Sequence, residues 1–192
     1  MAVLWAFVDE SCRVRPDDDC VYALAAVVLP SSGLEHVRSL MDSLRYGKAP
    51  TVHWRTERTP RKSLIAQAVA SIDFASVVAV SLHGPGSRPE RARRHCLLRL
   101  LPELSARDVG TVVFESRRTQ DAHDRAILTV LRRRGEVAAG MTVGWERASS
   151  DAALWAADVL AGIVTGWLGG ERLWWHLFKE RVTFLEAGET DR

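Results

Sequence analysis

The sequence MAVLWAFVDES (residues 1–11) joins the apolar run Met1–Val8 to an acidic pair, Asp9 and Glu10. A continuous apolar run of this length is typical of a strand that is buried on both faces. Charge is costly in such surroundings unless it is paired or coordinated. We therefore predict that a first, central strand reaches the surface at Asp9, and that this acid belongs to a functional site.

The segments that follow alternate between strand and helix patterns. Val21–Leu29 is a second apolar run, and the polar connection Arg13–Asp19 predicts that the two strands form an antiparallel pair. Ser32 and Glu35 have the spacing of a capping box, so we predict a helix from Gly33 to Tyr46.

The rest of the chain predicts a layered domain. Further strands are expected at Phe74–Leu82, Gly110–Phe114 and Met141–Trp145, and further helices at Pro60–Ile72, Pro89–Leu104 and Gln120–Arg134. A long helix capped by Ser149 or Ser150 is expected to carry Asp151 and Asp158, and a neighbouring helix is expected at Glu171–Arg181. We predict one α/β domain over residues 1–192, with a mixed five-stranded sheet and helices on both faces.

Composition excludes several classes of protein. Hydrophobic residues make up 47% and charged residues 26% of the chain, which is ordinary for a soluble globular protein. Cys12, Cys20 and Cys96 are odd in number and lack zinc-type spacing, which favours a reducing, cytoplasmic setting. The longest apolar segment, Ala152–Gly170, contains Asp158, and a carboxylate at the bilayer centre costs about 2.5–3.5 kcal/mol. We therefore expect no membrane span.

Two residue types bear on partners. Among the 26 basic residues only Lys48, Lys62 and Lys179 are lysines, and arginine suits phosphate contacts, so nucleic acid is a candidate partner. Solvated helix faces explain the arginine clusters at least as well. The Trp-rich C-terminal region can serve self-association into a homo-oligomer or base stacking, although core packing is the commoner role of such residues. Its members are Trp167, Trp174, Trp175 and Phe178.

Two later carboxylates repeat the setting of Asp9. Glu115 ends the apolar run Thr111–Phe114, and Asp158 interrupts the apolar stretch Trp155–Gly162. Asp158 has three explanations: a pair with an arginine, a place on a polar helix stripe, or a cation held together with other acids. Carboxylates suit Mg²⁺ or Mn²⁺, and two such ions about 3.5–4 Å apart stabilise the attacking and leaving oxygens of a phosphoryl displacement.

Three motifs carry a family resemblance. Phe7–Ser11, Val113–Arg117 and Leu154–Gly162 resemble, in that order, motifs of the family catalogued as domain of unknown function 3800, and the similarity covers nearly the whole chain. That family is placed in the ribonuclease H-like superfamily. The resemblance implies a ribonuclease H-like fold with Asp9 on the first strand, Glu115 on a neighbouring parallel strand and Asp158 on a late helix.

The sequence departs from the family at one position and leaves another open. Cys12 stands where the family commonly has glycine, so the turn there is expected to differ. His53 lies in an irregular segment, residues 47–59, in the region where many members carry a histidine. It is a candidate substrate-binding residue, although a lone loop histidine is more often incidental.

The leading interpretation is a metal-dependent phosphodiesterase, and more specifically a nuclease. Asp9, Glu115 and Asp158 would bind the metal, and Glu10 or Asp151 would complete the shell or orient a water. Substrate phosphate would meet Arg117 or Arg118, for which an intramolecular salt bridge is an equal or better interpretation. A Cys12 nucleophile is disfavoured, because nearby carboxylates should raise the thiol pKa.

Two alternatives remain open. The first is a ribonuclease H-like scaffold without catalysis, which would bind a protein or nucleic acid. The second is a hydrolase of small phosphoesters, which would be indifferent to salt because it contacts few backbone phosphates.

Overall fold

The two N-terminal apolar runs form the long antiparallel pair that the sequence predicts. These strands are β1 (Leu4–Val14) and β2 (Cys20–Pro30), which pair along their whole length. Successive side chains of a strand point to opposite faces of the sheet. Phe7 and Ala25 therefore enter one buried cluster, while Val8 and Leu24 enter another on the opposite face. The runs are continuous because both faces are covered.

The computed structural model describes residues 3–15, 18–84 and 88–188. Four further strands are β3 (Ala75–His83), β4 (Val109–Glu115), β5 (Thr142–Glu146) and β6 (Val182–Glu186). They complete a six-stranded sheet in the order β5-β4-β1-β2-β3-β6. β2 is antiparallel to both neighbours, whereas β4 runs parallel to β1, β5 to β4 and β6 to β3. The sheet is mixed, as predicted, but it has six strands rather than five.

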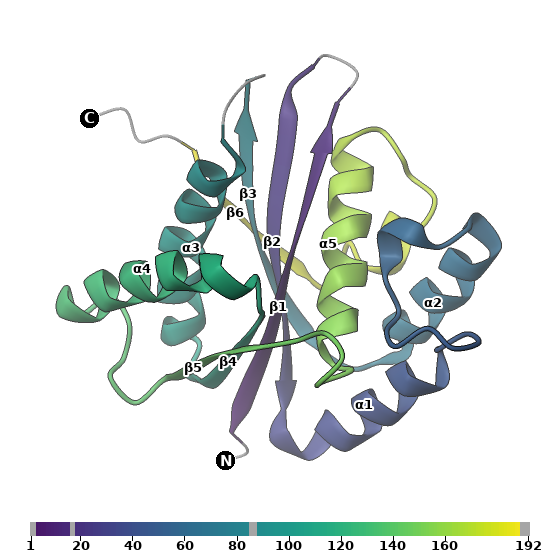
Figure 1. Cartoon of the computed structure of the whole chain (residues 1–192), viewed down its shortest axis with the longest axis horizontal. Helices are drawn as coiled ribbons and strands as arrows, with labels where there is room; N and C mark the ends of the chain where they lie inside the picture. The colour runs from purple at the N-terminus through teal and green to yellow at the C-terminus, as the bar shows by residue number, and fades with distance from the viewer. Residues whose placement is uncertain (1–2, 16–17, 85–87, 189–192) are drawn as a thin grey trace.

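Helices cover both faces of the sheet, which confirms the predicted layering (Figure 1). On one face lie α1 (Leu34–Ser43), α2 (Thr59–Ser71) and α5 (Leu154–Leu168). The other face carries α3 (Pro89–Ala106) and α4 (Asp121–Arg133). With β4 parallel to β1 and Asp158 on α5, the arrangement is the ribonuclease H-like one that the resemblance implied.

Four local predictions are wrong. β1 does not end near Asp9 but continues to Val14, because β2 pairs with it as far as Cys20. Asp151 precedes α5, whose N-terminus has no side-chain cap from Ser149 or Ser150; the Asp151 carboxylate instead accepts the Ala153 N–H at 3.0 Å. The capping box at Ser32 is likewise absent from α1.

The fourth error concerns the segment Glu171–Arg181, which forms turns and a single 3₁₀ turn at Trp175–Leu177. The chain reverses there to enter β6, the strand that the sequence pattern did not reveal. Trp174 and Phe178 are buried in the core, as core packing predicts. Trp167 and Trp175 stack at 4.4 Å and remain half-buried. Self-association through this region stays a prediction.

One arginine of the clusters on the predicted helices is buried, so neither a solvated helix face nor a phosphate contact describes it. Arg93 of α3 is 1% exposed and donates to Asp124 of α4 at 2.6 Å, to Glu10 of β1 and to the Tyr22 hydroxyl. Burial alone lowers the pKa of Arg93, but the Asp124 bonds and the Glu10 charge outweigh it and raise that pKa. This ion-pair network joins two helices to the central strand.

No helix in the described part of the chain is long and apolar enough to cross a membrane.

We predict that Asp124→Asn lowers the free energy of unfolding by about 3 kcal/mol, because it leaves a buried guanidinium partly unpaired. Urea unfolding followed by circular dichroism measures the change. Asp42→Asn is the matched control, since Asp42 is half exposed in its pair with Arg45 and such pairs contribute about 0–1 kcal/mol. Equal losses in the two variants would contradict the role given to the Arg93 network.

Candidate metal centre

Two of the three predicted acids lie side by side on adjacent strands, Asp9 on β1 and Glu115 on β4. The parallel pairing of β1 with β4 ends at Val8 and Phe114, and Asp9 and Glu115 are the residues that follow. Phe7 and Val113 belong to the cluster beneath α5, so strand alternation sends Asp9 and Glu115 to that face as well. Asp9 therefore lies where β4 ends rather than where its own strand ends.

The third acid reaches the same place from α5. Asp158 is 7% exposed and accepts the backbone N–H of Trp54 at 2.7 Å. His53 Nδ1 lies 3.1 Å from the same carboxylate. The helix is joined to the central strand by a hydrogen bond of 2.8 Å between the hydroxyls of Ser11 and Thr165. Asp158 has no arginine partner among the described residues, and it does not lie on a polar helix stripe, because it is buried.

The three carboxyl groups interact electrostatically. Burial raises the pKa of Asp9 well above its ordinary value, and the charges of Glu115, Asp158 and Glu10 raise it further. Hydrogen bonding with Glu115 is a further, smaller cause of the raised Asp9 pKa. The bond to Asp158 raises the pKa of His53, which burial opposes more weakly. The site thus concentrates negative charge in a region of low solvation.

The donor chemistry of the site fits a divalent cation. Among the described residues, no guanidinium or ammonium group forms a salt bridge with Asp9, Glu115 or Asp158. Carboxylate oxygens are the ligands that Mg²⁺ and Mn²⁺ prefer, and such a cation would offset the repulsion that raises the Asp9 pKa. The side chains are not preassembled: within the described ranges no group of three or more His, Cys, Asp or Glu residues has the geometry to hold a metal ion.

A glycine makes the approach of Trp54 to α5 possible. A Cβ on Gly162 would lie 2.8 Å from Nε1 and 2.9 Å from Cγ of the Trp54 indole, with a still closer clash at Cδ1. The indole cannot easily move, because it packs edge-on against Trp174 at 5.0 Å and beneath the Lys62 ammonium. Gly162 lies one turn after Asp158, so it allows the Trp54 N–H to reach that carboxylate.

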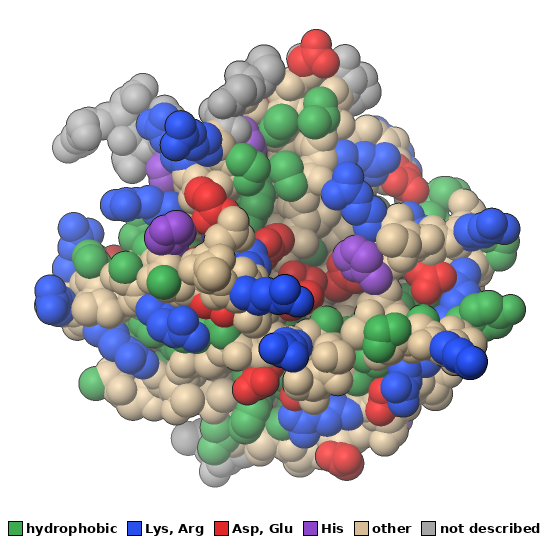
Figure 2. Space-filling view, in the orientation of Figure 1, with side chains coloured by type: hydrophobic (Ala, Val, Ile, Leu, Met, Phe, Trp, Pro, Cys, Tyr) green, Lys and Arg blue, Asp and Glu red, His purple; other side chains and the backbone are tan. Residues whose placement is uncertain are grey.

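Of the three acids, Asp158 lines a cleft of about 620 Å³, which Ser11 of β1 also lines. Figure 2 shows acidic side chains at the bottom of a hollow in the middle of this face, with basic side chains around its rim. His53 and Asp158 line the cleft on the α5 side, and Arg55 and Arg88 line it as well. Both arginines are exposed, and within the described ranges neither has a carboxylate partner.

The remaining predicted residues do not join the three acids, although Glu10 and Arg117 line the cleft. Glu10 points to the opposite face, where it pairs with Arg93, so it does not join the three acids. Asp151 is held by Arg38 of α1 through bonds of 3.0 and 2.6 Å. Arg117 forms the intramolecular salt bridge that was the alternative to phosphate binding, with Glu90 at 2.6 Å and Asp124 at 3.4 Å. Arg118 is exposed and does not line the cleft.

The loop around His53 contributes more to the cleft than the sequence pattern indicated. An irregular segment, residues 47–59, is a common place for the rim of a site, and His53 and Arg55 of this segment line the cleft. No sequence signal indicated Arg88, the Trp54 N–H or Gly162. The Cys12 pKa is raised, as predicted, but the causes are burial and Cys20 rather than the carboxylates.

Comparisons with known proteins give similar solved structures but no sequence match. No protein-family model and no curated protein sequence matches the chain. Among solved structures, ribonuclease H2 from Pyrococcus horikoshii OT3 is similar with a TM-score of 0.48 and 15% identity, over 85% of this chain and 72% of that one. A point mutant of Bst-RNase HIII gives a TM-score of 0.49 and 10% identity over 86% of this chain. The match covers 52% of Bst-RNase HIII, so the chain spans about half of its length.

We predict that Gly162→Ala lowers the free energy of unfolding by about 1–3 kcal/mol, because the added methyl overlaps a fixed indole. The pKa of His53 should also fall toward its ordinary 6.5 as the Trp54 loop moves away from Asp158. Urea unfolding and an NMR titration of the imidazole measure the two effects. Gly144→Ala, where the new Cβ meets no atom within 4 Å, is the control. An unchanged His53 pKa in Gly162→Ala would contradict the contact.

We predict that Asp9→Asn stabilises the metal-free protein at neutral pH by roughly 1–2 kcal/mol. The raised Asp9 pKa means that its charged form opposes folding above that pKa and ceases to do so as the pH falls toward 3.8. The advantage of the variant should therefore shrink on acidification. Thermal unfolding in EDTA from pH 8 to pH 4 tests this, with exposed Asp73→Asn as control. A variant less stable than wild type at pH 8 would refute the repulsion.

Proposed function

We propose that the protein is a divalent-metal-dependent phosphodiesterase that acts on nucleic acid, and hence a hydrolase of the nuclease class. One observation supports the proposal: Asp9, Glu115 and Asp158 belong to three distant segments, yet the charges of Glu115 and Asp158 raise the Asp9 pKa, and no described arginine or lysine pairs with any of the three. Placing like charges together in a buried site costs stability unless a ligand compensates for them.

Asp9, Glu115 and Asp158 would hold the cation. When bound, Mg²⁺ or Mn²⁺ lowers the pKa of a water and stabilises the oxygen that leaves phosphorus. The Trp54 N–H and His53 orient the Asp158 carboxylate, so that it meets the cation in one rotamer. His53 also has a largely exposed imidazole in the cleft, where it can contact substrate.

The cleft rim suits an extended, negatively charged substrate. Arg55 and Arg88 replace Arg117 and Arg118 as the preferred phosphate-binding residues, because Arg117 is occupied by carboxylates. A second cavity of about 640 Å³ shares Ser11, Cys12 and Arg55 with the cleft and is also lined by Lys62. The two cavities together form a groove with basic side chains along it, which favours a polynucleotide over a single phosphoester.

The alternative is a scaffold that binds protein or nucleic acid without catalysis. A specific observation favours it: the described acids are not arranged for immediate metal binding, and Asp158 already has two hydrogen-bond partners. In that case the acids would serve the fold or binding alone.

A cation titration with a substrate panel separates these functions. Calorimetry with Mn²⁺ and Mg²⁺ is followed by cleavage assays on single-stranded DNA, duplex DNA, RNA and a small aryl phosphodiester. We expect cation binding and cleavage of at least one polynucleotide, with Asp9→Asn and Asp158→Asn reducing the rate about 100-fold or more.

The control variant Glu103→Gln, a surface acid on α3 paired with Arg107, should keep full activity. Cleavage that survives in both Asp variants would come from a contaminant. Absence of cation binding, together with nucleic-acid binding, would establish the scaffold. Turnover of the aryl phosphodiester alone, insensitive to salt, would establish a small-phosphoester hydrolase.

A further inference from the structure

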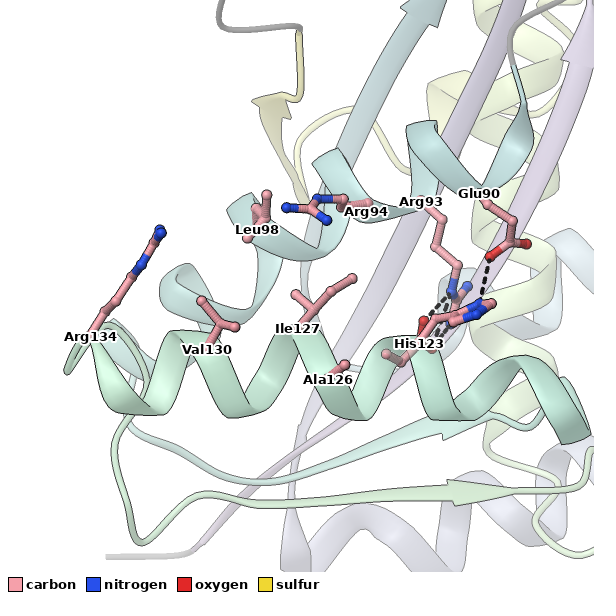
Figure 3. A pocket seen from close by; sticks show the side chains of 10 residues that line it. Glu90, Arg93, Arg94, Leu98, His123, Ala126, Ile127, Val130 and Arg134 are labelled. Atoms are coloured by element: carbon pink, nitrogen blue, oxygen red, sulfur yellow. Dashed lines mark hydrogen bonds and ion pairs between the residues drawn. The ribbon is translucent and has the colours of Figure 1, made fainter. Parts of the chain in front are cut away.

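A second cavity of interest lies between α3 and α4, on the face of the sheet opposite to α5. It has a volume of about 350 Å³ (Figure 3). Leu98 of α3 faces Ile127 and Val130 of α4 across it, and these three side chains form an apolar floor. Val130 is 42% exposed, whereas Leu128 and Leu131 of the same helix are buried in the core. We call this cavity the α3–α4 groove.

The acids of the α3–α4 groove are neutralised within the protein. Glu90 bonds to Arg117 at 2.6 Å, and Asp124 bonds to the buried Arg93 at 2.6 Å. Glu90 and Arg93 both lie at the end of the groove where His123 stands (Figure 3). Neither carboxylate is therefore available to repel an anionic ligand.

The guanidinium groups on its rim are not neutralised in the same way. Arg94 is exposed and has no ion pair with any residue in the described part of the chain. Arg134, at the far end of the floor in Figure 3, has a single pair with Glu136 at 3.8 Å. Both side chains of that pair are largely exposed, so it contributes little. The groove therefore combines an apolar floor with two available positive charges.

We infer that the α3–α4 groove docks an acidic amphipathic segment of a partner protein. Its apolar side chains would cover Leu98, Ile127 and Val130, and its carboxylates would pair with Arg94 and Arg134. Two helices with an apolar trough between them suit a segment with apolar anchors at helical spacing. A nucleic-acid backbone suits the groove less well, because it carries a charge at each nucleotide and has no apolar side chains to contact the apolar floor.

The position of the groove connects the partner to the cleft. Glu90 lines both cavities and is joined to Arg117, which lines the cleft. A segment docked between α3 and α4 would therefore lie beside the cleft without covering the three acids. This inference does not depend on the proposed hydrolase activity, since the groove uses none of the acids that would bind the metal.

The experiment selects peptides on the intact protein. A random peptide library displayed on phage is panned on wild type, and enriched sequences are made as fluorescein-labelled peptides for polarisation assays. We expect enrichment of apolar residues flanked by Asp or Glu. The double variant Arg94→Ala/Arg134→Ala should bind such peptides about five- to tenfold more weakly. Val130→Ser, at an exposed site, should also weaken binding, because the segment loses an apolar contact.

The matched control is Arg99→Ala/Arg133→Ala, which removes the same charge from exposed positions of the same two helices outside the groove. It should bind the peptides as wild type does. No enrichment, enrichment of basic peptides, or equal binding to both double variants would overturn the inference. A labelled single-stranded oligonucleotide is assayed in parallel. If it loses affinity for Arg94→Ala/Arg134→Ala while no peptide binds, the groove serves nucleic acid instead.

Discussion

The structure depends on how it accommodates buried negative charge. Asp9, Glu115 and Asp158 share a poorly solvated site in which burial and mutual repulsion raise the Asp9 pKa. Repulsion of this kind persists only where the surrounding fold over-determines it. Here the register of β1 with β4, the Ser11–Thr165 bond and the Trp54 N–H supply that constraint. The candidate site is thus a place where the fold tolerates a local cost, which is the usual property of a functional site.

A second consequence of strand geometry is the separation of Asp9 from Glu10. Adjacent residues of β1 face opposite sides of the sheet, so one acid joins the unpaired cluster and the other joins Arg93. The two faces of the sheet therefore accommodate buried carboxylates in different ways. Beneath α5 no described guanidinium group pairs with the acids, whereas beneath α3 and α4 internal guanidinium groups neutralise them. The Arg93 network also fixes the strand that carries Asp9, so it supports the site from behind.

The same division shapes the two surfaces that we consider functional. Beyond Val8, β1 continues but no longer pairs with β4. The cleft at this end of β4 is lined by His53, Arg55, Arg88 and Asp158. Between α3 and α4, internal pairing of Glu90 and Asp124 leaves Arg94 and Arg134 as the available charges. Catalysis and partner docking would then occupy opposite faces, with Glu90 and Arg117 at the boundary.

The sequence by itself determined the layering and the central strand pair, and it singled out Asp9, Glu115 and Asp158 as candidate site residues. Continuous apolar runs mark doubly covered strands, and an acid within such a run has few inexpensive explanations. The sequence did not reveal β6, the burial of Arg93 or the contact of Gly162 with Trp54. These features depend on residues far apart in the chain, and local periodicity carries no information about which distant side chain will be the partner. Tertiary structure alone decided that Asp158 meets His53 rather than an arginine, and that Glu10 belongs to a different charge centre from Asp9.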